Sequence, residues 1–310
     1  MTMNSTPPKT VLISGANGYF GGIACQYFES KAWTVLKATR QPDADVFLDL
    51  DRPDDFAQQT VDGAIDLFVH AAAAHEVTCR EQPYRSVIQN VVGTKAALDF
   101  CVANQIPKFV YLSTFHVFGN PQGIIDEQTQ PFPANDYGLS HLQAEEYVQM
   151  YTRQKSIQGL VVRPSNFFGV PADVRTCKRW TLTPLAFCKE AIEHRKIVLR
   201  TPGFQQRNFV SVLDICGAID AAIHHPTNPS LLHIAGPETI SIRDLAKLVQ
   251  RVALETLGIE VELSIPDGTP MDSTFTYTSQ SLNTLYQPTQ TLEPFVADFC
   301  KVLNAILEPV

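Results

Sequence analysis

Short apolar runs alternate with longer segments of helical spacing through the first half of the chain. The runs lie at residues 11–13, 34–38, 46–48, 67–69, 109–112 and 160–162. Strands separated by helix-length segments predict parallel pairing through crossover helices. The nearly continuous apolar character of the runs indicates a sheet that is covered on both faces. The predicted fold class is α/β, with a Rossmann-type doubly wound parallel sheet.

The rhythm loosens after Asn166, where prolines punctuate the chain. Apolar periodicity nevertheless predicts helices over residues 240–257 and 292–307. We expect a smaller C-terminal α/β portion that binds substrate. The predicted division gives residues 9–168 plus about 205–235 to a dinucleotide-binding domain. Residues from about 169–204 plus 236–310 then form the substrate-binding portion.

The stretch Ser14–Gly22 lies where the first predicted strand turns into a helix. Gly15 and Gly18 permit backbone angles that are closed to other residues, and they allow close approach of a ligand. The following helix directs its free N–H groups and positive dipole end at the loop, which favours an anion there. The pattern predicts a pyrophosphate site; a glycine-rich turn that only packs is the alternative.

Composition narrows the classes of function. The chain has 310 residues, 45% of them hydrophobic and 18% charged, as in ordinary soluble proteins. A net charge of −8 without a Lys/Arg run argues against nucleic acid as a partner. No apolar run is long enough to predict a membrane span, and the first nine residues lack the apolar core of a secretory signal. Seven dispersed cysteines without a Cys-x-x-Cys pair indicate reduced thiols and no metal site, so we expect a cytoplasmic protein.

The end of the second predicted strand bears on the choice of cofactor. An acidic residue there would bind the ribose of NAD, whereas an arginine accommodates the 2′-phosphate of NADP. Here the strand ends at Thr39 and Arg40, so we expect NADP, with NAD as the alternative. Asp49 and Leu50 are expected to flank the adenine; a turn aspartate is an equally good interpretation of Asp49.

Three further residues form a second candidate constellation. Thr114 follows a predicted strand, Tyr137 begins a predicted helix, and Asn90 lies on the long helix expected over residues 81–104. Tyr137 has an ordinary packing role as its alternative. Beside the glycine loop and a strand-end threonine, a chemical role is the better interpretation.

Several motifs occur in order and together carry a resemblance. They are Gly15-x-x-Gly18-x-x-Gly21, His70-Ala71-Ala72, Asn90, Ser113-Thr114 with Val117-Phe118-Gly119, Tyr137, Arg163-Pro164-x-Asn166 and Arg207-Asn208-Phe209-Val210. The chain, from about residue 10 to 288, resembles the extended short-chain dehydrogenase/reductase family of the NAD-dependent epimerase/dehydratase type. That family acts largely on nucleotide sugars.

The resemblance implies a role for each matching position. The pyrophosphate would be held by Gly15, Asn17, Gly18, Tyr19, Phe20 and Gly21. The cofactor site would also include Ala71, Ala72 and Asn90. Thr114 would hydrogen-bond the substrate oxygen, and Tyr137 would be the general acid/base. Asn166 would contact substrate phosphate or sugar, and Arg207 would pair with a diphosphate. His75 and His116 are further candidates for substrate contact.

The main departure from the family is His141, which stands where the Tyr-x-x-x-Lys motif has lysine. The lysine binds the nicotinamide ribose and lowers the tyrosine pKa. Three interpretations follow. His141 replaces the lysine with altered pH dependence; or Tyr137 serves mainly as an acid in carbonyl reduction; or the site binds nucleotide without redox turnover.

A second departure concerns Phe115 and His116, which stand where the sugar 4,6-dehydratases place an Asp-Glu pair. Dehydration is therefore disfavoured. The sequence favours an NAD(P)-dependent oxidoreductase or epimerase acting on a nucleotide-activated sugar, as a 4-epimerase or keto-reductase. The alternative is a nucleotide-binding sensor or scaffold of the same fold. By analogy with the family we expect a homodimer formed through the helices at residues 81–104 and 137–154.

Overall fold

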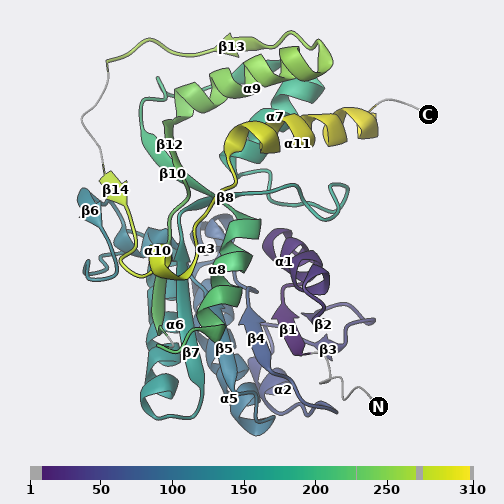
Figure 1. Ribbon diagram of the computed structural model, residues 1–310, viewed down its shortest axis with the longest axis vertical. Coiled ribbons are helices and arrows are strands. Elements are labelled where there is room, and N and C mark those ends of the chain that lie inside the picture. Colours follow the sequence, from purple (N-terminus) through teal and green to yellow (C-terminus); the bar gives the residue numbers. More distant parts are fainter. Residues whose placement is uncertain (1–8, 228, 270–274, 308–310) are drawn as a thin grey trace, which may run out of the picture. The chain divides into compact units, whose positions relative to one another are not determined.

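The computed structural model describes residues 9–227, 229–269 and 275–307 (Figure 1). The chain forms two compact units and crosses between them several times. The first unit holds the described residues up to Asn120, together with Thr129–Arg163 and Cys216–Leu232. The second holds Pro121–Gln128, Pro164–Ile215 and the described residues from His233 onward.

A seven-stranded sheet forms the centre of the first unit. Its strands are β1 (Thr10–Ser14), β2 (Thr34–Thr39), β3 (Val46–Phe47), β4 (Leu67–His70), β5 (Lys108–Leu112), β7 (Gln158–Pro164) and β11 (Leu231–Ile234). Their order is β11-β7-β5-β4-β1-β2-β3, and the pairings of β1 with β2 and β4, of β2 with β3, and of β5 with β4 and β7 are all parallel. The order reverses between β1 and β4, which is where ligands bind in such sheets.

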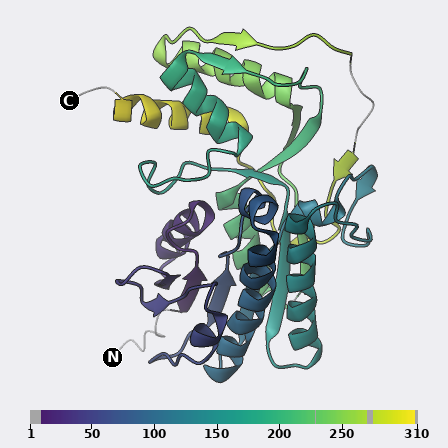
Figure 2. The same ribbon diagram turned by 180° about the vertical axis from the view of Figure 1, so that it is seen from behind.

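Helices cover both faces of this sheet, as predicted for a doubly wound fold. One face carries α1 (Tyr19–Ser30) and α8 (Val212–His224), and the other carries α2 (Pro53–Ala57), α5 (Gly93–Ala103) and α6 (Asp136–Arg153). Figure 2 shows α5 and α6 running side by side over the second face. There Phe56 of α2 stacks on Phe100 of α5, with ring centroids 4.5 Å apart. The predicted fold class is therefore confirmed.

The helical run before β5 is less regular than the single helix expected over residues 81–104. It consists of α3 (Glu76–Glu81), α4 (Pro83–Ser86), a π-helical segment η1 (Val87–Val92) and α5. Pro83 has no N–H group to continue the preceding helix, so a new helix begins there. After β5, a short 3₁₀ segment η2 (Phe115–Phe118) leads away from the sheet edge.

The second unit is built from small sheets and several helices. Its sheets are β8 (Asn166–Phe168), β10 (Gln206–Ser211) and β12 (Glu238–Ser241); β9 (Lys196–Val198) and β13 (Glu262–Ser264); and β6 (Gly123–Ile125) and β14 (Phe275–Tyr277). Its helices are α7 (Thr183–His194), α9 (Ile242–Leu257), α10 (Leu282–Leu285) and α11 (Leu292–Leu307). The apolar stripe of α11 packs against α7 and α9.

Several segments that the sequence assigned to the dinucleotide-binding domain fall in the second unit, among them residues 164–168 and two strands. Strand β6 pairs with β14, so residues 121–128 belong with the C-terminal chain. Strand β10 pairs with β8 and β12, and this places residues 206–211 there as well. In both cases hydrogen bonds to a strand far along the chain decide the membership, and sequence periodicity does not report such partners.

Candidate active site

The glycines between β1 and α1 are required by close backbone contacts. Gly15 has φ of +67°, and a Cβ atom there would lie 3.2 Å from the backbone of Ala72. A Cβ atom at Gly21 would lie 2.1 Å from the carbonyl oxygen of Gly15. The same carbonyl oxygen accepts a 2.7 Å hydrogen bond from the N–H of Gly18. The turn is therefore tight, and it brings the start of α1 close to the residues after β4.

The N-terminus of α1 fits an anionic ligand. No side chain caps this helix, and its first turn contains no acidic residue. The partial positive charge of the helix end is thus not opposed by a carboxylate of the first turn. Asn17 and Gly18 are exposed beside it, whereas Tyr19 and Phe20 are buried. The loop therefore has the geometry that a dinucleotide pyrophosphate requires.

Ser14 joins the glycine loop to the residues that follow β4. Its hydroxyl oxygen accepts hydrogen bonds of 3.0 Å from the N–H groups of both Ala71 and Ala72. The hydroxyl hydrogen is then left for Nδ1 of His70, 2.9 Å away. His70 is fully buried, and desolvation lowers its pKa to about 3, so it accepts this bond as a neutral ring. His70 therefore helps to hold Ser14, which joins the glycine loop to the residues after β4.

The residues expected around the adenosine ribose lie at the ends of β2 and β3. Thr39 is buried and its hydroxyl oxygen accepts a 3.1 Å bond from the N–H of Gln41, whereas Arg40 is exposed. Asp49 accepts a 3.1 Å bond from the N–H of Asp51, which is the turn role considered for it. Leu50 packs against Gly93 of α5. Adenine contact by Asp49 and Leu50 remains a prediction.

Asn90 joins three parts of the site through its buried amide. Its Oδ1 accepts a 2.6 Å bond from the N–H of Ala74, and its Nδ2 donates a 2.9 Å bond to the hydroxyl of Ser140. Ser140 in turn donates to the carbonyl oxygen of Tyr137 at 3.2 Å. Asn90 thus ties the segment after β4 to the first turn of α6. Direct cofactor contact by Asn90 remains a prediction.

The first turn of α6 packs tightly on η2. Asn135 caps the helix by accepting the N–H of Gly138, and a Cβ atom at Gly138 would lie 2.4 Å from the carbonyl oxygen of His116. The ring of Tyr137 meets that of His116 edge to face, with centroids 5.6 Å apart. Thr114 is buried before η2, and its hydroxyl oxygen accepts a 3.2 Å bond from the N–H of His116. These contacts bring Thr114, His116 and Tyr137 together where η2 meets the start of α6.

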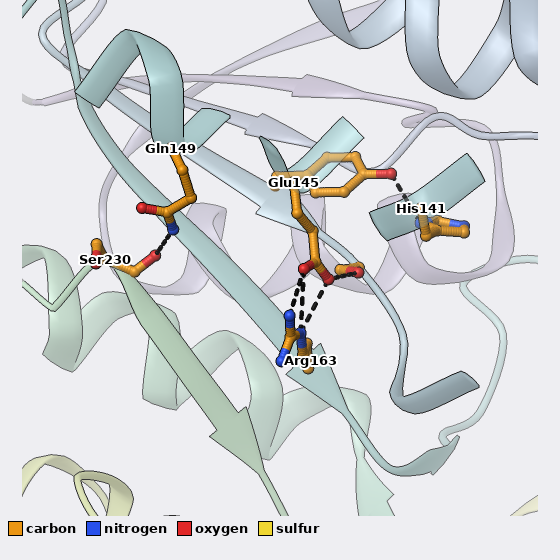
Figure 3. Close-up of polar contacts among 7 residues, drawn as sticks. His141, Glu145, Gln149, Arg163 and Ser230 are labelled. Carbon is orange, nitrogen blue, oxygen red and sulfur yellow. Dashed lines mark hydrogen bonds and ion pairs between the residues drawn. The ribbon is translucent and has the colours of Figure 1, made fainter. Parts of the chain in front are cut away.

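His141, one helical turn after Tyr137, is enclosed. Its side chain is 3% exposed, and its Nδ1 lies 2.7 Å from the hydroxyl of Tyr111 on β5 (Figure 3). Its Nε2 is buried without a hydrogen-bond partner. Burial, helped by the neighbouring His116 and His70, lowers the pKa of His141 to about 3. The His141 ring contacts the Tyr137 ring, with 4.7 Å between centroids. Because of its low pKa, His141 is a neutral neighbour of Tyr137.

The polar face of α6 continues beyond His141 in steps of four residues. Glu145 receives hydrogen bonds from Arg163 at 3.0 and 2.5 Å, and Gln149 donates to the carbonyl oxygen of Ser230 at 2.8 Å (Figure 3). Ser113 also donates to Glu145. Glu145 and Tyr111 were not among the predicted site residues. The four-residue spacing from Tyr137 is the sequence signal that could have indicated Glu145.

The remaining candidates lie on other elements. His75 is exposed and caps α3, where its Nδ1 accepts from the N–H groups of Val77 and Thr78 at 3.2 and 3.4 Å. In the second unit, Asn166 donates to the carbonyl oxygen of Asn208 at 3.2 Å. Arg207 donates to the carbonyl oxygen of Gln206 at 3.0 Å, and partial burial lowers its pKa. Substrate contact by these three candidates remains a prediction.

Comparison with known proteins places these features in context. The chain is 29% identical over 175 residues to short-chain dehydrogenase/reductase family 42E member 1 of Xenopus laevis, covering 54% of this chain and 43% of the relative. It is 25% identical over 293 residues to a dTDP-4-dehydro-6-deoxy-D-allose reductase of Streptomyces sp., covering 87% and 89%. The chain thus spans less than half the length of the first of these relatives.

A solved structure shares the fold. The structure of RMD from Pseudomonas aeruginosa complexed with NADPH superposes with a TM-score of 0.80 at 18% identity, over 96% of this chain and 99% of the other.

Among the residues that the structure describes, none of the helices is both long and apolar enough to cross a membrane.

The match to a family model covers most of the first unit and extends into the second. The model of the NAD dependent epimerase/dehydratase family matches residues 11–235, which is more than half of the chain. The match includes the glycine loop, Thr114, Tyr137 and both of the second-unit candidates. The chain therefore belongs to the NAD dependent epimerase/dehydratase family.

Proposed function

We propose that the protein is an NAD(P)-dependent oxidoreductase or epimerase that acts on a nucleotide-activated sugar, as a keto-reductase or a 4-epimerase. In this proposal Tyr137 passes a proton to or from the substrate oxygen, and Thr114 hydrogen-bonds the same oxygen. His141 is the third member of this catalytic group, as the ring that packs against Tyr137.

The observation that carries this proposal is the clamp made by Asn90. Its hydrogen bonds to Ala74 and Ser140 tie the cofactor loop region to the turn that bears Tyr137. A dinucleotide fold alone needs no such link between the segment after β4 and a tyrosine. The link holds an acid/base group in a fixed relation to the site where the cofactor would react.

The cofactor would be held by its pyrophosphate at the uncapped start of α1 and along Ala71 and Ala72. When bound, a nicotinamide dinucleotide supplies hydride transfer. We propose NADP, because the exposed Arg40 follows β2 and no carboxylate ends that strand. NAD is the alternative, in keeping with the family to which the chain belongs.

The proposed substrate class is supported by a relative that covers 87% of this chain. That relative is named as a reductase of a dTDP-linked 4-dehydro-6-deoxy sugar. We propose a nucleotide sugar of this kind for this chain, with Arg207 and Asn166 as contacts to phosphate and sugar. Arginine suits the phosphate because its planar fork matches phosphate oxygens.

The test is a spectrophotometric assay. Purified protein with NADPH and a dTDP-4-dehydro-6-deoxy-hexose should show substrate-dependent loss of absorbance at 340 nm. Epimerase activity is assayed with UDP-glucose and followed by product chromatography. Tyr137→Phe should abolish turnover and leave NADPH affinity nearly unchanged. Unaltered turnover in Tyr137→Phe would contradict the mechanism.

A second candidate function is a nucleotide-binding sensor without turnover. The observation that favours it is the enclosure of His141, which leaves no charged group in the place of the family's lysine. Tight NADPH binding, without any substrate-dependent change at 340 nm across nucleotide sugars and simple ketones, would favour the sensor over the enzyme.

A further inference from the structure

Tyr137 lies between two histidines that differ in their access to water. His116 on η2 is exposed, and its ring meets the tyrosine ring at 5.6 Å between centroids. His141 is 3% exposed and meets the same ring at 4.7 Å. Both contacts are edge-to-face. The two imidazoles therefore flank one phenol, with one in solvent and one enclosed.

The relation between His116 and Tyr137 is fixed by the backbone. The carbonyl oxygen of His116 lies so close to Gly138 that a Cβ atom there would approach it to 2.4 Å. The N–H of His116 donates to Thr114, the residue expected to hold the substrate oxygen. The backbone of His116 is thus held beside Thr114 and beside Gly138, the residue after Tyr137.

The buried side of Tyr137 offers no route for a proton. Nδ1 of His141 is committed to the hydroxyl of Tyr111, and its Nε2 is out of contact with solvent. Arg163, a buried cation, is paired with Glu145. The other titratable groups around this core are His70 on β4, Cys79 on α3 and Tyr111 itself; burial keeps the histidine neutral and both the thiol and the phenol protonated.

We propose that His116 is the proton-transfer partner of Tyr137, which it connects to solvent. This inference rests on the proposed function. In carbonyl reduction the substrate carbon would gain the hydride that a bound NADPH supplies, and the substrate oxygen takes the proton of the Tyr137 hydroxyl. The resulting phenolate takes a proton from the imidazolium of His116, and the neutral imidazole then takes one from water. Sugar oxidation runs the same transfers in reverse, so atoms and charges balance in both directions.

Imidazole is suited to this task for a chemical reason. Its unperturbed pKa near 6.5 allows it to gain and lose a proton at neutral pH, which a phenol near 10 does poorly alone. Family members with a lysine in place of His141 carry a fixed charge beside the tyrosine. Here an exposed histidine would supply the proton, because solvent can recharge it.

The first experiment measures turnover of NADPH and a dTDP-4-dehydro-6-deoxy-hexose against pH. His116→Ala should lower kcat by about a hundredfold or more, as expected for loss of general acid–base assistance. Added free imidazole should restore a large part of it, and His116→Gln should lose the alkaline-side limb of the pH profile, because the proposed step needs the protonated ring. His194→Gln, an exposed histidine at the end of α7, is the matched control and should behave as the unaltered protein.

The proposal is overturned if His116→Ala keeps the wild-type pH profile. It is equally overturned if activity falls but neither the profile changes nor imidazole restores it, because that pattern indicates a structural role or substrate contact.

A second experiment needs neither substrate nor cofactor. The ring C–H signal of His116 is titrated by NMR in the full chain and in Tyr137→Phe. The midpoint of His116 should move when the tyrosine hydroxyl is removed, while that of His194 stays. An unmoved His116 midpoint would refute the coupling even if the protein turned over no sugar. Failure of the proposed function alone would leave this coupling intact.

Discussion

His141 and Tyr111 share an enclosed hydrogen bond, with 2.7 Å between the imidazole Nδ1 and the phenol oxygen. The His141 member of the pair contacts the ring of Tyr137. The two neutral side chains hold each other in place.

Acid should destabilise the protein through its two buried histidines. The pKa values of His70 and His141 are each lowered to about 3, whereas an unfolded histidine titrates near 6.5. Below pH 6.5 the unfolded chain therefore binds more protons, and stability falls as pH drops toward 3. Each histidine should contribute a slope of about 1.4 kcal/mol per pH unit. Urea unfolding between pH 7 and 4 measures this slope, and His141→Gln should reduce it.

A lysine at position 141 should not raise the turnover of the enzyme. The site encloses a neutral ring against Tyr111, and an ammonium group there would be desolvated and would leave the phenol without its partner. We expect His141→Lys to lower the free energy of unfolding by about 1–3 kcal/mol and to lower turnover at neutral pH. His141→Gln is the control that retains a hydrogen-bond partner. Higher turnover in the lysine variant would show that histidine limits the enzyme.

The buried ion pair between Glu145 and Arg163 should show strong coupling. Side-chain exposures of 4% and 6% mean that removing one partner leaves the other desolvated. Glu145→Gln should cost about 3–5 kcal/mol in urea unfolding. The double variant Glu145→Gln/Arg163→Met should recover much of that loss, because no uncompensated charge stays buried. Additive losses in the double-mutant cycle would mean that the two side chains act independently.

Arg40 should decide the choice between the two dinucleotides. If its guanidinium pairs with the 2′-phosphate, Arg40→Ala should weaken NADPH binding by about tenfold to a hundredfold and leave NADH nearly unchanged. Arg52→Ala is a matched control, since Arg52 is exposed and pairs with Asp55. Fluorescence titration of both cofactors measures the effect. Equal losses for NADPH and NADH would refute the 2′-phosphate contact.

Exposed apolar residues on the helical run before β5 support the proposed homodimer. Val87, Ile88 and Val92 are each 40–43% exposed, and Leu139 of α6 is 44% exposed. A charge at their centre should disfavour association, so Ile88→Asp should shift the protein to monomer in light scattering. Leu254→Asp, on an equally exposed apolar position of α9, should not. A monomeric wild-type protein would contradict the proposal outright.

The order of elements in the first unit followed from local patterns. Apolar runs and helical spacing predicted the strands that form the sheet and the helix that begins beside Tyr137, and the helix over Leu292–Leu307 is confirmed to the residue. These patterns report which face of a segment is buried, and that is settled within a few turns of the chain. The family resemblance followed from the same short motifs.

Contacts between distant segments were decided by the tertiary structure alone. The spacing of Tyr137 and His141 is visible in the sequence, but the enclosure of His141 depends on Tyr111, which lies 30 residues earlier. The clamp by Asn90 and the pairing of β6 with β14 likewise join segments that no local pattern relates. The sequence by itself determined that a tyrosine and a histidine stand one helical turn apart. Only the fold decided that the histidine is desolvated and neutral, because burial is set by what packs around a side chain.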